Sequence, residues 1–198
     1  MIILNMLQGS DEWFKIRTGL PTSSNFDKIV TTDGKPSKQR EKYLYTLAGE
    51  KVSGIKEDTF QSFAMQKGIE KELEARNYYK MLYDVEVQEV GFCLADNGLY
   101  GCSPDGLIGD DGGVEIKAPL IHTHVSYLLK GKLLEDYYQQ AQGSLFVTGR
   151  KWWDIMSYYA SLRPVIIRVL PDKTFLKALE VELILFCDEL EKITSKIK

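Results

Sequence analysis

The segment that most constrains the fold is a pair of short apolar runs on either side of a turn. Residues 103–107 (SPDGL) lead into the first run, residues 109–113 form a turn rich in Gly and Asp, and the second run contains residues 114–117 (VEIK). This pattern predicts a β-hairpin that brings Asp105 and Glu115 close together at one end of a sheet. Glu115 and Lys117 lie two positions apart in an extended run, so their side chains face the same side.

Two carboxylates and an amine that converge on one point suit a hard divalent cation and an activated water. That chemistry indicates cleavage of phosphodiester bonds. A simpler interpretation is also open, because Ser-Pro-Asp-Gly is a good turn sequence in its own right. Glu-Ile-Lys would then be an ordinary strand with polar residues on its solvent face. The hairpin alone does not decide between the two interpretations.

Three further blocks flank the hairpin. They are residues 8–13 (QGSDEW) with Arg17, Gly19 and 22–24 (TSS), residues 68–72 (GIEKE), and residues 140–142 (QAQ). Pro104-Asp105 with Glu115-Ile116-Lys117 matches the PD-(D/E)xK nuclease core. In this order, the four blocks together resemble the lambda-type exonuclease (YqaJ-type viral recombinase) family. The resemblance runs from about residue 8 to about residue 159.

The hairpin carboxylates Asp105 and Glu115 are the expected main ligands of Mg²⁺, which prefers oxygen ligands, and Mn²⁺ should substitute for it. The resemblance implies that the backbone carbonyl of Ile116 completes the shell. Lys117 would orient or deprotonate the attacking water, or stabilise the transition state. A lysine base needs a lowered pKa, and neighbouring carboxylates raise it, which favours orientation and electrostatic stabilisation.

Two more acids enter through the resemblance. Of Glu70, Glu72 and Glu74, the family pattern Gly-x-x-x-Glu selects Glu72 as a catalytic, metal-site residue, although a charged helix face would explain all three. Asp96 would be a further ligand, with a spacing to Asp105 that departs from the family by about one residue. Two metal ions per active site would activate the nucleophile and stabilise the leaving oxygen.

A second group of residues is implied to bind the 5′-terminal phosphate of a DNA duplex. Arg17 and Ser24 match the family's phosphate positions, and Ser103 and Gln140 would join them. A guanidinium and a hydroxyl near a helix start make a sound phosphate clamp. Arg17 could instead be an exposed helix residue, and Gln140 and Gln142 could be structural hydrogen-bonding residues. Core packing explains Trp13 better than base stacking.

The length of 198 residues predicts one domain, 1–198. A net charge of −3 argues against a tight, non-specific, static nucleic-acid binder, but it does not exclude a processing enzyme. Basic residues cluster at 35–42 and at 130–132, where a local track for DNA and an ordinary solvated surface are equally good explanations.

The remaining composition bears on compartment and metal chemistry. Three cysteines without metal-site spacing are expected to be reduced core thiols, and the two histidines are expected at the surface; these residues are Cys93, Cys102, Cys187, His122 and His124. No apolar run approaches the roughly 20 residues of a membrane span. The start of the chain lacks the features of a signal peptide, so a cytoplasmic location is expected.

Periodicity predicts an α/β fold with a mixed central β-sheet and helices on both faces, as the PD-(D/E)xK (restriction-endonuclease-like) core implies. Helices are expected from residue 10, capped by Ser10, and at 22–30, 37–52, 59–82 with a break or bend near Gly68, 122–129, 134–146 and 175–197. Strands are expected at 85–95, 98–108, 114–118, 152–159 and 165–170.

The resemblance implies a Mg²⁺-dependent 5′→3′ exonuclease on double-stranded DNA that leaves a 3′ single-stranded tail for recombination. It also implies a ring-shaped homotrimer and a single-strand annealing protein as partner. The alternative is a PD-(D/E)xK endonuclease that acts on a specific DNA sequence or structure, although such an enzyme needs no terminal-phosphate pocket. A non-catalytic DNA-binding scaffold is disfavoured because Asp105, Glu115 and Lys117 are all present.

Overall fold

The computed structural model describes residues 1–56 and 63–198, with side chains from residue 71 onward in the second range. Its helices are α1 (Asp11–Arg17), the 3₁₀ helix η1 (Ser23–Lys28), α2 (Arg40–Ser53), α3 (Phe63–Tyr83), α4 (Ile121–Lys130), α5 (Leu133–Thr148) and α6 (Lys173–Ile197). Its strands are β1 (Ile2–Leu4), β2 (Phe92–Leu94), β3 (Gly101–Cys102), β4 (Gly106–Ile108), β5 (Gly112–Lys117), β6 (Trp152–Ser157) and β7 (Val165–Val169).

The described strands form two sheets. Strands β4-β5-β6-β7 make a mixed sheet, in which β5 and β6 are parallel and the other two pairs are antiparallel. Strands β1-β2-β3 make a small antiparallel sheet, and a bridge between Gln88 and Leu107 connects the segment before β2 to β4. The predicted mixed α/β architecture is therefore confirmed, with an additional sheet built on β1, a strand that the sequence did not indicate.

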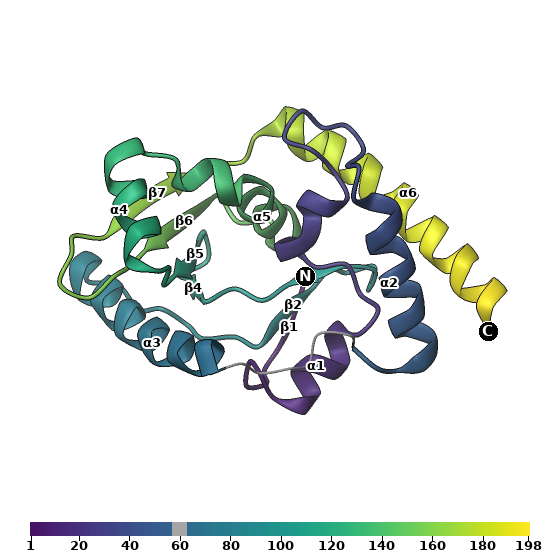
Figure 1. The fold of residues 1–198 in the computed structure, drawn as a ribbon, viewed down its shortest axis with the longest axis horizontal. Helices are drawn as coiled ribbons and strands as arrows, with labels where there is room; N and C mark the ends of the chain where they lie inside the picture. The colour runs from purple at the N-terminus through teal and green to yellow at the C-terminus, as the bar shows by residue number, and fades with distance from the viewer. Residues whose placement is uncertain (57–62) are drawn as a thin grey trace.

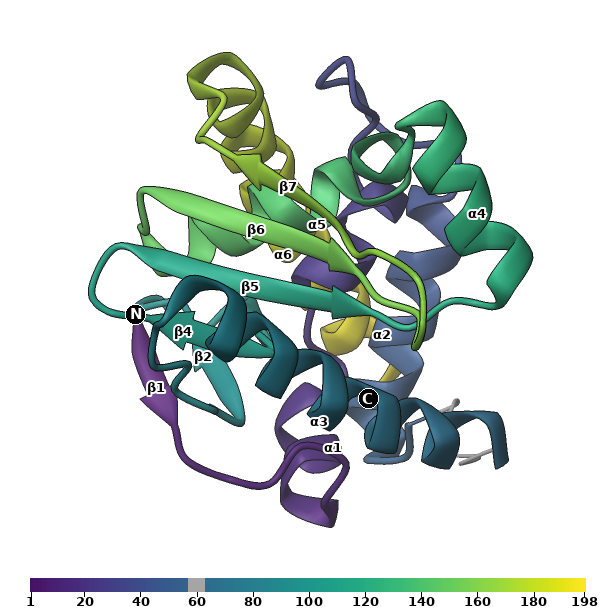
Figure 2. The same ribbon diagram turned by 90° about the vertical axis from the view of Figure 1, so that its left-hand side faces the viewer.

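Helices cover both faces of the mixed sheet (Figures 1 and 2). Figure 2 shows α3 in front of β5, with α5 and α6 behind it. Strand β5 is buried on both faces, and its side chains alternate between them. Val114 and Ile116 pack with Ala75 and Tyr79 of α3 in one apolar cluster. Glu115 and Lys117 consequently face the opposite side, where α5 lies.

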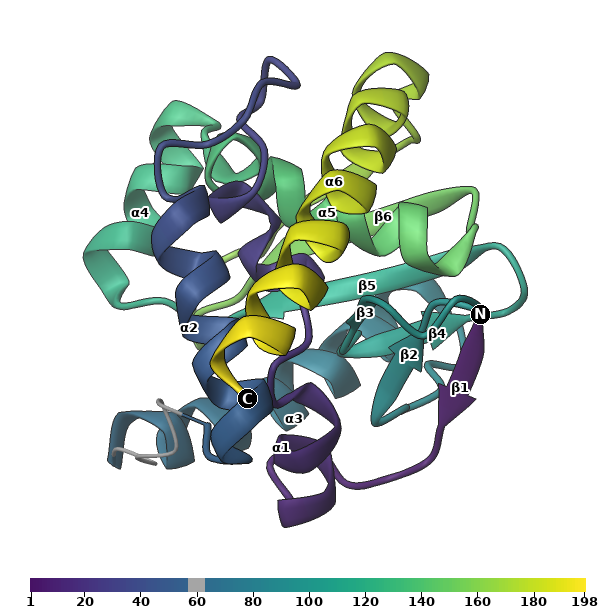
Figure 3. The ribbon, with the colours of Figure 1, turned by 90° about the vertical axis from the view of Figure 1, so that its right-hand side faces the viewer.

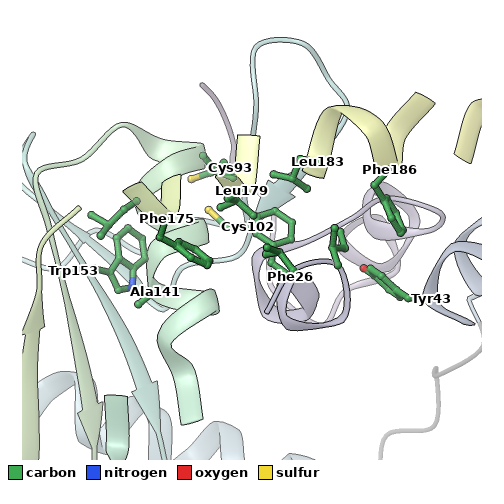
Figure 4. Packing of buried hydrophobic residues seen from close by; sticks show 14 of the residues in the cluster. Phe26, Tyr43, Cys93, Cys102, Ala141, Trp153, Phe175, Leu179, Leu183 and Phe186 are labelled. Atoms are coloured by element: carbon green, nitrogen blue, oxygen red, sulfur yellow. The ribbon is translucent and has the colours of Figure 1, made fainter. Parts of the chain in front are cut away.

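The larger core lies on the α5 and α6 side of the sheet. Trp153 of β6 belongs to one apolar cluster with Phe175, Leu179 and Phe186 of α6, and Figure 4 shows these side chains in a row that extends to Tyr43 of α2. Helices α2 and α6 run side by side at this end of the molecule (Figure 3). Among the described residues, no helix has both the length and the apolar character needed to cross a bilayer.

The structure departs from the sequence-based boundaries where hydrogen bonding, rather than periodicity, sets the ends. Of the expected strand at 85–95, only Phe92–Leu94 joins a ladder, and the expected strand at 98–108 is divided into β3 and β4. Helix α2 begins at Arg40, three residues after the expected Ser37. Helix α3 runs unbroken through Gly68, and positions 59–62 of that prediction lie outside the described residues.

The prediction of a surface position is wrong for His124. Its side chain is fully buried, with Nδ1 2.8 Å from the Ser157 hydroxyl and Nε2 3.1 Å from the carbonyl of Arg163. Both ring nitrogens therefore have structural partners, whereas His122 is exposed. All three cysteines are buried and unpaired, as expected of core thiols.

Candidate active site

The β4–β5 hairpin positions the central acids. Gly106 pairs with Val114 and Ile108 with Gly112, so a three-residue loop joins the strands. Arg150 clamps this loop by donating to the carbonyls of Gly109 and Gly112, both at 2.7 Å. Extending the register by one residue sets Asp105 opposite Glu115. The predicted hairpin and its approach of the two carboxylates are thus present.

Both carboxylates are buried and hydrogen-bonded. The Ile116 backbone N–H donates to Asp105 Oδ2 at 2.6 Å. Glu115 Oε1 accepts from Lys117 Nζ at 2.8 Å and from Gln140 Nε2 of α5 at 2.6 Å. The side chain of Glu115 is 7% exposed, so few of its interactions are with water.

Lys117 remains an ammonium at neutral pH. Burial acts to lower its pKa, but the Glu115 and Asp105 carboxylates outweigh burial and raise the pKa above the usual value. The same Nζ lies 4.7 Å from the centre of the Tyr137 ring, a second interaction that favours the cation. A charged lysine can donate hydrogen bonds and stabilise negative charge, but it cannot accept a proton.

Glu72 reaches the site from α3 and is held by a salt bridge to Arg76, with Oε1 2.6 Å from Nη2. Burial raises the pKa of Glu72, opposed by Arg76 and reinforced by Glu115. Burial also raises the pKa of Asp105 well above its usual range, and the Glu115 and Glu72 carboxylates raise it further. Burial and the neighbouring carboxylates therefore both disfavour the ionised form of Asp105.

A cavity of about 1090 Å³ opens onto these residues. Its wall combines residues 5–9 and α1 with α3, the segment 89–91 and the ends of β4 and β5. Asp105, Glu72 and Lys117 line it together with Trp13 and Arg17. Glu115 adjoins this surface through its bond to Lys117. The cavity thus brings the acidic group and Arg17 to one space.

Arg17 and Ser103 form a direct pair beside the acids. Ser103 Oγ accepts from Arg17 Nη1 at 2.8 Å and from Trp13 Nε1 at 3.0 Å. The guanidinium also lies over the Trp13 ring, 4.2 Å from its centre. Within the described part of the chain, Arg17 Nε is buried and has no hydrogen-bond partner. Burial lowers the pKa of Arg17, but a guanidinium stays charged at neutral pH.

The other two predicted phosphate ligands have different surroundings. Gln140 bonds Glu115, so it lies against the acidic group rather than against Arg17. Ser24 is exposed on η1, and its hydroxyl contacts Thr22 at 3.2 Å. Trp13 is half-buried, and its indole N–H donates to Ser103. Trp13 therefore contacts the site in addition to any role in core packing.

The structure does not bring Asp96 to this site. Asp96 lies in the turn between β2 and β3, its side chain is 81% exposed, and it forms a salt bridge of 2.8 Å with the N-terminal ammonium. The hairpin of β2 and β3 turns it away from Asp105, which follows β3. Glu74 accepts from the Tyr158 hydroxyl at 2.7 Å, and the Glu70 side chain lies outside the described residues. Gln142 is buried and bonds the carbonyl of Leu170, the structural role considered for it.

The donor set at the hairpin fits a hard divalent cation. Asp105 and Glu115 supply two buried carboxylates with the Ile116 backbone between them, and a bound cation would favour the ionised form of Asp105, whose pKa burial raises. In the described residues, no group of three or more acidic, histidine or cysteine side chains is gathered tightly enough to hold a metal. Two carboxylates, a carbonyl and waters are sufficient for Mg²⁺, which keeps part of its hydration shell.

Comparison with known proteins decides the family. Residues 12–151 match the model of the YqaJ-like viral recombinase domain. The chain belongs to this family. LHK-Exo, an alkaline exonuclease from Laribacter hongkongensis, is 32% identical over 95% of this chain and 96% of its own, with a TM-score of 0.85. A structure of LHK-Exo in complex with dAMP matches equally well, at 32% identity, over 96% of each chain and with a TM-score of 0.85.

A more distant structure agrees in fold. A phage-related exonuclease from Haemophilus somnus 129PT has a TM-score of 0.71 at 13% identity, over 90% of this chain and 96% of its own. A comparison with curated protein sequences finds no match. This chain therefore has the PD-(D/E)xK type of fold. The solved structures named above, to which it is similar, are exonucleases.

Sequence reasoning missed two residues at the site and gave a third no role. Arg76 could have been found from the sequence, because it lies four positions after Glu72, a spacing at which two side chains on a helix can pair. Tyr137 beside Lys117 has none, because it sits at a kink in α5 with non-helical backbone angles. Gln8 belongs to a family block, and its Nε2 donates to the carbonyls of Val90 and Pro104.

Proposed function

We propose that this protein is a Mg²⁺-dependent 5′→3′ exonuclease that acts on double-stranded DNA. The observation that carries the proposal is the shared cavity, where a buried acidic pair adjoins the half-buried Arg17, whose Nε has no hydrogen-bond partner among the described residues. The acids suit phosphodiester hydrolysis, and the arginine suits a terminal phosphate. An enzyme in which the phosphate site adjoins the cleavage site would bind the terminal phosphate of a DNA strand and cut the strand next to that end.

In the proposed reaction, Asp105, Glu115 and the Ile116 carbonyl would hold Mg²⁺, or Mn²⁺ in its place, and Glu72 would help to hold a second ion. The metal supplies an activated water and stabilises charge on the phosphate. Lys117, held as an ammonium by Glu115, donates to the attacking water or to the developing negative oxygens. Gln140 fixes Glu115 Oε1 from the other side, which keeps the carboxylate oriented toward the site.

The 5′-phosphate is proposed to bind between Arg17 and Ser103. Ser103 Oγ accepts two hydrogen bonds, so its own proton remains to be donated to a phosphate oxygen. Arg17 Nε makes no hydrogen bond within the described residues, so the guanidinium keeps a donor for a phosphate oxygen besides its bond to Ser103. LHK-Exo forms a complex with dAMP, a nucleoside monophosphate, which supports recognition of a nucleotide that carries a phosphate. Ser24 would join only after a rotation of its exposed side chain.

Digestion from the 5′ end leaves a 3′ single-stranded tail, the substrate that a single-strand annealing protein would receive for recombination. We also propose that the chain acts as a homotrimeric ring in the cytoplasm. A ring that encloses the duplex would retain it despite a net charge of −3 per chain. Light scattering tests this directly, because a mass near 22.6 kDa at micromolar concentration would exclude the ring.

Linear and closed-circular duplexes of the same sequence distinguish the candidate activities. The proposed enzyme digests only the linear form in the presence of Mg²⁺, and it releases mononucleotides from the 5′ end. Cutting of the circle would identify an endonuclease of the same core. Absence of cutting of either form by folded protein in Mg²⁺ or Mn²⁺ would leave a DNA-binding scaffold.

A further inference from the structure

Arg76 is a nearly buried cation that contacts Glu72, Glu89 and the backbone of Asp105, next to the acidic residues of the site. Its side chain is 10% exposed and projects from α3 into the cavity wall. Nη2 lies 2.6 Å from Glu72 Oε1, and Nη1 lies 2.7 Å from Glu89 Oε2. Nε donates to the backbone carbonyl of Asp105 at 3.0 Å. Each nitrogen of the planar guanidinium therefore has an acceptor from a different residue.

These bonds act on the position of the acids rather than on the reacting atoms. Arg76 bonds the main-chain carbonyl of Asp105, which leaves the carboxylate of Asp105 to the site. Gln8 holds the preceding carbonyl, that of Pro104, at 2.8 Å. The Pro104-Asp105 backbone is thus fixed by two side chains from different segments. Glu72 is fixed to the same guanidinium, so its distance from Asp105 is set by Arg76.

We propose that Arg76 is the positioning residue of the metal site, which sets the separation of Glu72 from Asp105. The proposal rests on the metal-dependent function proposed above. Without Arg76, the Glu72, Asp105 and Glu115 carboxylates repel one another, and the link between α3 and β4 is lost. Residues that orient metal ligands typically contribute about 10- to 100-fold to metal affinity. Exposed Glu89 completes the coordination of the guanidinium.

The variants Arg76→Met and Arg76→Lys separate charge from geometry. Methionine removes both, whereas lysine keeps the charge but not the planar fork that reaches three acceptors. We expect Mn²⁺ affinity of the DNA-free protein, measured by electron paramagnetic resonance of the free ion, to fall about tenfold or more in both variants. The Mg²⁺ concentration for half-maximal digestion should rise by a similar factor.

Arg168→Met is the matched control. Arg168 also binds a buried carboxylate, that of Asp154, through Nε at 2.8 Å, but it does not line the cavity. Its loss should lower stability and leave Mn²⁺ affinity within about twofold of wild type, because the acids of the site keep their partners. A shift of the same size in this variant would show a general loss of structure and overturn the inference.

Wild-type Mn²⁺ affinity in either folded Arg76 variant would overturn the positioning role. Failure of both Arg76 variants to fold, while Arg168→Met folds, would also overturn it in favour of a purely structural role. Failure of the proposed function gives a different result: wild-type protein itself would bind no Mn²⁺ and digest no DNA.

Discussion

Replacing Asp105 by asparagine should abolish digestion and stabilise the metal-free protein. Asparagine keeps the shape and the side-chain oxygen that accepts from the Ile116 N–H, so the hairpin contact survives. The substitution removes one charge from a buried group in which Glu115 and Glu72 repel Asp105. Like charges that share a buried site are costly to keep ionised, and the loss of one relieves the other.

The magnitude follows from the hairpin register. Residues opposite each other in an antiparallel pair have Cβ atoms about 5 Å apart. At an effective dielectric constant of about 20, two unit charges at that distance repel by about 3 kcal/mol. Lys117, 2.8 Å from Glu115, offsets part of this, which leaves about 1–2 kcal/mol. For a chain of this length, that gain raises the melting temperature by roughly 2–8 °C.

The gain should depend on pH. In the unfolded chain the Asp105 carboxyl ionises near its ordinary pKa of about 3.9, whereas the folded pKa is raised. Between these two values the native state binds more protons than the unfolded state, so wild-type stability falls as pH rises through that window. The Asp105→Asn variant has no carboxyl at this position, so its stability does not fall in this way as the pH rises. Its advantage should therefore be largest at pH 8 and shrink toward pH 4.

Melting curves in chelator and in Mg²⁺ test the reasoning. In chelator at pH 8 the variant should melt above the wild type. Mg²⁺ at 100 times its dissociation constant stabilises the wild type by about 2.7 kcal/mol and should leave the variant almost unchanged. A variant that melts below wild type in chelator, or that gains as much from Mg²⁺, would refute the account of the site. Retained digestion would remove Asp105 from the metal ligands.

Three further substitutions test other parts of the structure. Lys117→Ala should lower the turnover number about 100-fold or more, with Mn²⁺ and DNA affinity retained in binding assays, because Lys117 acts on the transition state. Arg17→Ala should slow digestion of 5′-phosphorylated ends about tenfold and barely affect 5′-hydroxyl ends; equal wild-type rates on both ends would remove the phosphate pocket. Arg168→Met should cost about 2–3 kcal/mol in urea unfolding, since Asp154 stays buried and keeps only its Tyr79 partner; a loss below about 1 kcal/mol would contradict this.

The sequence predicted the core of the site because local rules decide that part. The Gly- and Asp-rich turn specifies a hairpin, and the period of two places Glu115 and Lys117 on one face. Ser10 caps α1 as predicted, accepting from the Trp13 N–H at 3.3 Å. Such features depend on residues only a few positions apart. The hairpin and the start of α1 could therefore be located before any tertiary contact was known.

Contacts between distant segments were beyond the same reasoning. The pairing of β1 with β2 joins residues some 90 positions apart in the chain. Strand β1 has only three residues, which is too short for an alternating pattern of apolar and polar residues to be recognised. His124 was expected at the surface because its partners, Ser157 and the Arg163 carbonyl, come from later segments. Asp96 fits the family only by approximate spacing, and the N-terminal ammonium pairs with it instead.

The site also explains why its acids are held by so many separate segments. A buried carboxylate is costly unless it is paired or hydrogen-bonded, and Asp105, Glu115 and Glu72 share one region. Their partners come from β5, α5 and α3, namely the Ile116 N–H, Lys117, Gln140 and Arg76. Each partner removes part of the cost, yet the pKa of Asp105 remains raised by burial and by the two other acids. A divalent cation would remove the remainder, so the proposed catalytic ion would also be a stabilising ligand of the fold. Metal affinity and the stability of the α3–hairpin contact should accordingly change together wherever a substitution alters one of these partners.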